Sequence, residues 1–196
     1  MENKVQFGLS DVHIGLYTVS ETGEMTLGKP DKLPGAVSLS MDPETMELEF
    51  YADNVKYYAQ KSDNGFTGTL EVAKFPNSIK TKYMGYAETE DGGVANLKGV
   101  QKPSVYIAFE AQGDAQKSRG MLLNVSMGPI KHEHKTTEDK VDVETDSVDI
   151  TVVGDNKTGL VLVEYAQDSA GYATLFTAPN APKLKATTSS GSSETH

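Results

Sequence analysis

Residues 34–73 read PGAVSLSMDPETMELEFYADNVKYYAQKSDNGFTGTLEVA, and this stretch decides the fold. Apolar side chains alternate with polar ones around residues 37–41, 46–51 and 66–72. Alternation with a period of two residues is typical of half-buried β-strands. Turn-forming residues separate the runs, namely Asp42-Pro43, Ala52-Asp53-Asn54 and Ser62-Asp63-Asn64-Gly65, the last ending in an Asn-Gly pair that favours tight turns. The segment therefore predicts a strand, an excursion with its own hairpin, and a returning strand.

The rest of the chain continues the β pattern. Further strands are expected from the apolar alternation or apolar runs at 12–18, 105–109, 121–127, 148–152, 160–163 and 172–176. A change in the phase of the alternation predicts a bulge or bend near residues 145–147. One short helix is expected after Phe75, capped by Asn77 or Ser78 and ended by Gly85, with Ile79, Tyr83 and Met84 on one side. The predicted fold class is mainly β, a β-sandwich or partly rolled β-barrel with one short flanking helix.

The length of 196 residues suits one domain with flexible ends. We expect a single β domain over residues 1–182, with an N-terminal arm at 1–10 and an extended loop or hairpin at 42–65. Residues 183–196 are too poor in apolar side chains to offset the cost of ordering, so a flexible C-terminal tail is predicted. Residues 87–101 are polar and contain glycine, which predicts a surface loop with a short strand near Val94.

The composition disfavours several classes of function. The formal net charge is −10 and Arg119 is the single arginine, whereas affinity for nucleic acid comes mainly from lysine and arginine. The chain has no cysteine, which excludes disulfides, thiolate metal sites and a cysteine nucleophile. The first residues lack the basic and apolar regions of a secretory signal, and no apolar run is long enough to span a membrane. These features predict a protein made in the cytoplasm, with no membrane partner.

Three patterns that resemble reactive sites have simpler explanations. His132-Glu133-His134 places two imidazoles on one side of a strand, but a third ligand from Glu138, Asp139 or Asp142 has no fixed geometry. The glycine-containing segment 154–159 has its lysine before the second glycine and precedes a strand, which favours a hairpin turn over a phosphate loop. Glu47 and Glu49 are expected on the wet side of a sheet rather than as a glycosidase pair. We therefore expect no catalytic residue, no metal and no cofactor, and predict that the chain is not an enzyme.

Six segments carry a resemblance to a known family. PGAVSLSMD, FYADNVKYY and NGFTGTLEVA, followed by SVYIAFEAQG, SRGMLLNVSMG and LFTAPNAP, occur in an order that resembles the major tail proteins of long-tailed bacteriophages. The resemblance covers most of the chain, from Val5 to Pro182. Residues 87–101 and 131–149 do not resemble a feature of that family.

The resemblance implies a virion structural protein, the tail tube subunit. Its copies would form hexameric rings that stack into a hollow tube for DNA passage during ejection, with other tail proteins at the tube ends. The protein would be located in the virion tail after synthesis in the host cytoplasm. Double-stranded DNA would pass through the lumen without specific binding, because an excess of carboxylates repels phosphate. The candidate contacts between subunits are Met46, Leu48, Phe50, Tyr51, Tyr57, Tyr58 and Phe66.

An alternative function is a β-sandwich module that binds carbohydrate or a cell surface. In that case Tyr51, Tyr57 and Tyr58 would contact the ligand. The two functions differ in particle size, since a tail subunit forms rings or tubes and a binding module stays small.

Overall fold

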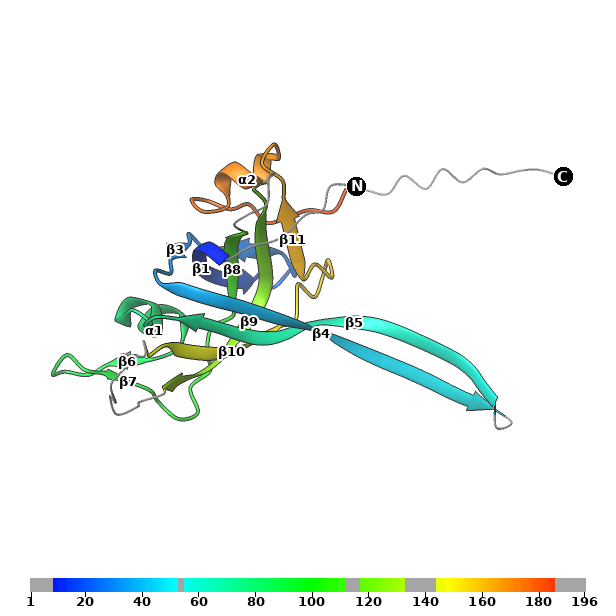
Figure 1. Cartoon of the computed structure of the whole chain (residues 1–196), viewed down its shortest axis with the longest axis horizontal. Helices are drawn as coiled ribbons and strands as arrows, with labels where there is room; N and C mark the ends of the chain where they lie inside the picture. The colour runs from blue at the N-terminus through cyan, green and yellow to red at the C-terminus, as the bar shows by residue number, and fades with distance from the viewer. Residues whose placement is uncertain (1–8, 53–54, 112–116, 133–143, 186–196) are drawn as a thin grey trace, which may run out of the picture.

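A computed structural model of the chain describes residues 9–52, 55–111, 117–132 and 144–185, with the backbone alone for residues 46–61 and 132 where these are included. The described chain is mainly β, a curled half-barrel sheet with two short helices (Figure 1). The partly rolled barrel of the sequence prediction is therefore confirmed. The strands are β1 (Leu9–Val19), β2 (Met25–Leu27), β3 (Asp31–Lys32), β4 (Ala36–Ala52), β5 (Val55–Val72), β6 (Ala87–Glu88), β7 (Val94–Ala95), β8 (Val105–Ala111), β9 (Arg119–His132), β10 (Asp146–Val152) and β11 (Leu162–Tyr165).

The main sheet runs in the order β2-β1-β8-β9-β10-β5-β4, and its neighbouring strands pair antiparallel. β3 adds to β1, and β11 adds to β9. Among the described strands, β2 and β4 therefore end the sheet. β6 and β7 form a separate small sheet, which confirms the short strand predicted near Val94.

Both faces of the central strand β8 are covered. Val105 and Ile107 belong to the larger core, and Tyr106 and Ala108 to a smaller core on the other face. All four side chains have no exposed area, as the apolar run at 105–109 predicts for a central strand. The alternation in β10 is likewise confirmed, because Val148, Ile150 and Val152 are buried. The register shift in that region lies opposite β9 between Val148 and Ile150, slightly later than the predicted bulge.

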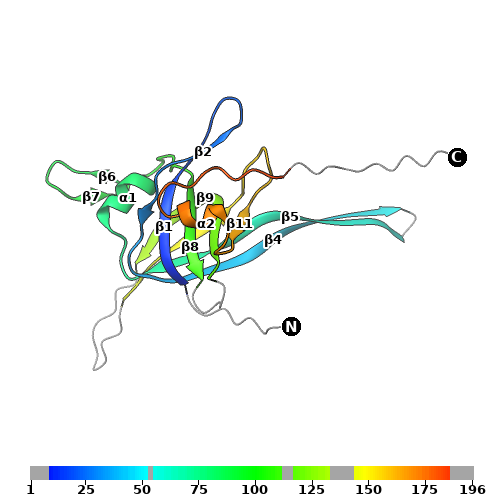
Figure 2. The ribbon, with the colours of Figure 1, turned by 90° about the horizontal axis from the view of Figure 1, so that it is seen from above.

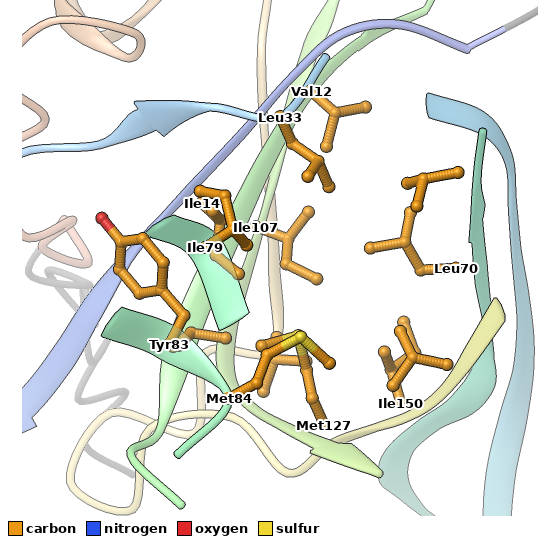
Figure 3. Packing of buried hydrophobic residues seen from close by; sticks show 14 of the residues in the cluster. Val12, Ile14, Leu33, Leu70, Ile79, Tyr83, Met84, Ile107, Met127 and Ile150 are labelled. Carbon is orange, nitrogen blue, oxygen red and sulfur yellow. The ribbon is translucent and has the colours of Figure 1, made fainter. Parts of the chain in front are cut away.

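The helix α1 (Asn77–Tyr83) closes one side of the larger core (Figure 3). Its buried side chains Ile79 and Tyr83, with Met84 just after it, are those expected from the sequence. The predicted cap is wrong, since the N-cap position is Pro76 and no side chain caps the helix. Packing rather than capping holds the helix: the Tyr83 hydroxyl donates a 2.7 Å hydrogen bond to Asp31, in addition to its buried ring.

A second helix, α2 (Ala170–Thr174), replaces the strand predicted at residues 172–176. Leu175, which follows it, is buried in the smaller core. Phe176 stacks on His13, with ring centroids 4.3 Å apart. His13 and Tyr17 lie on the same face of β1, and Phe176 and Leu175 cover this face.

Candidate assembly interface

The hairpin of β4 and β5 extends far beyond the rest of the molecule (Figures 1 and 2). Its two strands pair from Ala36 opposite Val72 to Ala52 opposite Val55. β10 pairs with β5 only from Val72 to Phe66. Beyond that point residues 45–52 and 55–63, which we call the projecting ribbon, pair only with each other among the described strands. At about 3.3 Å per residue the ribbon is about 25 Å long.

Two of the predicted turns within this segment are wrong. Asp42-Pro43 and Asn64-Gly65 lie inside the paired strands, and Pro43 is opposite Phe66. β4 is an edge strand, which is where a sheet tolerates the missing N–H of proline. A register shift between Glu44 and Thr45 takes up the local irregularity as a bulge. The reversal at Ala52-Asp53-Asn54 agrees with the pairing of Ala52 with Val55, although residues 53–54 lie outside the described part of the chain.

Glycine is needed at position 65 because the backbone of a neighbouring strand approaches it closely, and not because the chain makes a tight turn there. Its φ of 117° is unfavourable for other residues, and a Cβ there would overlap the carbonyl oxygen of Val152. Gly68 is similarly restricted, because a Cβ would overlap the carbonyl oxygen of Ser40 on β4. The sheet is therefore tightly packed where the ribbon leaves it.

Polar contacts strengthen this base. The Glu71 carboxylate accepts hydrogen bonds from the hydroxyls of Thr145 and Ser38, and these hold its pKa below the ordinary value. The backbone N–H of Phe75, just after β5, donates a 3.0 Å hydrogen bond to Asp146 on β10. The ribbon thus projects from a fixed base.

A two-stranded ribbon alone in water is marginally stable. Each of its strands also presents an outer edge to which no described strand pairs. Unpaired strand edges readily accept a further strand, and natural monomers usually shorten or cover them. A ribbon of this length is consequently the part of the described chain best suited to contact another protein.

Six of the seven candidate contact residues have backbone positions on this ribbon: Met46, Leu48, Phe50, Tyr51, Tyr57 and Tyr58. Their side chains lie outside the described part of the structure, so their role stays a prediction. The seventh, Phe66, lies at the base, where its partly buried ring packs against the larger core of its own chain.

The single arginine lies away from the ribbon, on the face covered by α2. Arg119 donates hydrogen bonds of 2.9 Å to the Glu110 carboxylate and 2.7 Å to the Tyr172 carbonyl oxygen. Its guanidinium carbon lies 3.9 Å from the Tyr172 ring centroid and 4.1 Å from that of Phe176. This side chain is thus engaged within the chain. The sequence carries no periodic signal for the cluster, because Tyr172 and Phe176 are more than fifty residues away from the paired residues Glu110 and Arg119.

The segment 154–159 forms a turn, as the sequence predicts. Asp155 is buried, and its carboxylate accepts hydrogen bonds from the Tyr17 hydroxyl at 2.7 Å and from the Thr158 N–H and hydroxyl at 2.7 and 2.6 Å. Burial raises the pKa of Tyr17, and the bond to Asp155 raises it further. The carboxylate therefore organises the turn between β10 and β11.

Within the described residues, no three histidine or carboxylate side chains gather in a way that could hold a metal ion. The residues considered and set aside as metal ligands in the sequence, namely His134, Glu138, Asp139 and Asp142, lie outside the described part of the chain, as does the His132 side chain. None of the described helices has the length and apolar character needed to cross a membrane.

Comparison of the sequence with protein families and with curated proteins finds no match. Among solved structures, the fold is similar to the sheath–tube complex of an extracellular contractile injection system, PVC, in its extended state, with a TM-score of 0.42 and 12% identity over 80% of this chain and 88% of that chain. The sheath/tube terminator of the same type of system gives a TM-score of 0.49 and 11% identity over 83% and 98% of the two chains. The tube-terminating cap of the anti-feeding prophage gives 0.45 and 10% over 85% and 96%. Since all three TM-scores are below 0.5, the function is inferred from the residues and geometry of this chain.

Proposed function

We propose that the chain is the major tail tube subunit of a long-tailed phage, a structural protein that self-assembles into stacked hexameric rings. The observation that carries the proposal is the projecting ribbon, whose strands pair only with each other among the described strands. A long paired hairpin that leaves the body gains stability only when another surface covers it. The sequence resemblance of residues 34–73 to major tail proteins supports the identity of that other surface as a further copy.

The sheet topology is compatible with ring formation. β4 ends the sheet on one side and β2 on the other, so one copy presents two different edges. Contacts between two different surfaces are heterologous, and they close into a ring when the rotation between copies divides a full turn evenly. A second heterologous contact, made by the ribbon, would stack one ring on the next. In this proposal the contacts at the tube ends are made by other tail proteins.

The charge suits a channel for DNA. The carboxylates outnumber the lysines and the single arginine is engaged internally, so the net charge of −10 gives the subunit no net attraction to phosphate. In the proposed virion tail, double-stranded DNA would pass through the lumen during ejection without specific binding. The protein has no catalytic role in this proposal.

Removal of the ribbon tests the function. We would replace residues 45–63 by a two-residue Asn-Gly turn, which is suited to a short hairpin. Because the described core lies outside the ribbon, the truncated chain should keep its circular dichroism spectrum and a melting temperature within a few degrees of the full chain. The full chain should form rings and tubes in negative-stain electron microscopy, whereas the truncated chain should sediment as a monomer.

A matched control shortens another exposed hairpin, the β6–β7 connection at residues 89–93, and should leave assembly intact. Tubes of normal length from the ribbon-truncated chain would exclude the assembly role of the ribbon. A full chain that stays small and binds a glycan would instead support the carbohydrate-binding or cell-surface module.

A further inference from the structure

An apolar groove lies where the half-barrel remains open. One wall is the start of β4, with Val37, Leu39 and Met41, and the other is formed by the paired ends of β1 and β8, with Leu9, Phe109 and Ala111. Leu9, Leu39, Met41 and Phe109 are only partly buried and pack on the larger core. The core is thus incompletely covered along this line, and exposed apolar surface of this kind marks contact sites.

Val37 is the most exposed apolar residue of the groove. It is 51% exposed, and it occupies the register shift between Ala36 and Ser38, so it has no partner on β5. A bulge of this type turns a side chain away from the regular face of the sheet. A single half-exposed valine is common on protein surfaces. Val37, however, extends the apolar wall that Leu39 and Met41 form along the groove.

The groove lacks the features of a small-molecule site. Such sites orient their ligand with a few polar groups that point inward. The one polar lining residue is Ser38, and its hydroxyl already donates a 3.0 Å hydrogen bond to Glu71. Along the groove, the outer edge of β4 pairs with no described strand. An unpaired edge favours the addition of an extended peptide segment over the binding of a small molecule.

The chain itself supplies a matching segment. The projecting ribbon combines unpaired strand edges with a sequence rich in apolar and aromatic residues, including Met46, Leu48 and Phe50. The groove and the ribbon lie at opposite ends of the same strand β4, so one copy cannot place its own ribbon in its own groove. Repeating this contact from copy to copy produces a head-to-tail arrangement. Residues 186–196 contain no large apolar side chain and are a poor match.

We infer that the groove between β4 and the β1–β8 ends receives the projecting ribbon of a second copy of this chain. The inference rests on the proposed function, and it names the surface on which the ribbon docks. The ribbon edge would extend the sheet at β4, and its apolar residues would cover Val37, Leu39 and Phe109.

Disulfide trapping tests the contact directly, since the chain has no cysteine of its own. In the variant Val37→Cys with Leu48→Cys, the two positions are eleven residues apart on one strand, or about 35 Å at the usual rise. A disulfide needs Cα atoms within about 7 Å, so it can form only between copies. Oxidation of the assembled protein should give a ladder of covalent multimers in non-reducing gels. The control pair Leu97→Cys with Leu48→Cys uses an exposed residue outside the groove and should give none.

A second measurement uses matched charge insertions. Val37→Asp should raise the protein concentration needed for assembly at least tenfold, because it places a carboxylate in the apolar contact. Val153→Asp is the control, since Val153 is 52% exposed and lies outside the groove. Both variants should keep the melting temperature of the parent chain.

The outcomes separate the two proposals. Assembly without the ladder, together with normal assembly of Val37→Asp, would overturn the groove as a docking site while leaving the tube function intact. A disulfide from Phe7→Cys with Val37→Cys in place of the Leu48 pair, either within one copy or as a ladder, would show that residues 1–8 occupy the groove, which also overturns the inference. A parent chain that never assembles would overturn the proposed function and the docking site together.

Discussion

At the scale of single residues, the buried carboxylate of Asp155 is the clearest determinant of stability. Burial by itself raises the pKa of this group, but hydrogen bonds from Thr158, Tyr17 and the backbone outweigh it and hold the pKa below its ordinary value. A lowered pKa in the folded state means that the ionised carboxylate stabilises the fold above the unfolded-state pKa of about 3.9, and that this contribution is lost as the pH falls through the folded-state pKa. Asp155→Asn should therefore lower the free energy of unfolding by about 2 kcal/mol at pH 7, and by less near pH 3.

Urea denaturation of the parent chain and the variant at the two pH values measures this difference. Asp168→Asn is the control, because Asp168 is exposed in the turn before α2 and should change the free energy of unfolding by less than about 0.5 kcal/mol at either pH. An equal loss for Asp155→Asn at pH 7 and pH 3 would contradict the assigned role of the ionised carboxylate.

At the scale of elements, α2 depends on one side chain from β9. A helix of five residues is too short to be stable alone, and Arg119 holds it through the Tyr172 carbonyl oxygen and the rings of Tyr172 and Phe176. Lysine cannot form this planar, multiply bonded contact. Arg119→Lys should weaken the docking by about 1–2 kcal/mol, so amide hydrogen exchange in residues 170–176 should be about 5–30 times faster.

Protection in β8 should change much less in this variant, since Val105 and Ile107 hold its other face in the larger core, which contains no residue of the α2 segment. Lys131→Ala serves as the control, because its ion pair with Asp149 is exposed and contributes little. Uniformly faster exchange across the sheet would indicate that Arg119 supports the whole fold instead of one helix.

The same elements show how far the sequence could predict the fold. β8, β9 and β10 were predictable because burial imposes their apolar patterns, and α1 because Ile79, Tyr83 and Met84 share one side. The turns at Asp42-Pro43 and Asn64-Gly65 were wrong because an edge strand tolerates proline, and because Gly65 meets a neighbouring carbonyl that lies far away in sequence. α2 was missed because the conformation of its segment depends on contacts of Tyr172 and Phe176 with Arg119 and His13. The periodicity of five residues cannot reveal contacts with residues that are distant in sequence. The groove was not predictable either, since it joins the ends of three strands.

At the scale of the whole molecule, assembly has to overcome repulsion between like-charged copies. Each chain carries a formal net charge of −10, and residues 44–63 alone contain five carboxylates and two lysines. The range of this repulsion falls from about 30 Å at 0.01 M salt to about 8 Å at 0.15 M, while burial of apolar groups in the interface is not weakened by screening. We therefore expect the concentration needed for assembly to fall roughly tenfold between 0.02 and 0.5 M NaCl, which corresponds to about 1.4 kcal/mol.

Light scattering and sedimentation velocity over a protein dilution series would measure that change, with electron microscopy to confirm that the scattering particles are rings or tubes. The ribbon-truncated chain is the control, because it should stay monomeric at both salt concentrations and so separates specific assembly from salting out. Assembly that becomes weaker as salt is added would mean that pairs of opposite charge hold the copies together. In that case the apolar groove beside Val37 would contribute less than the ion pairs, and the contact would be governed by lysines such as Lys56 and Lys61 meeting carboxylates of the next copy.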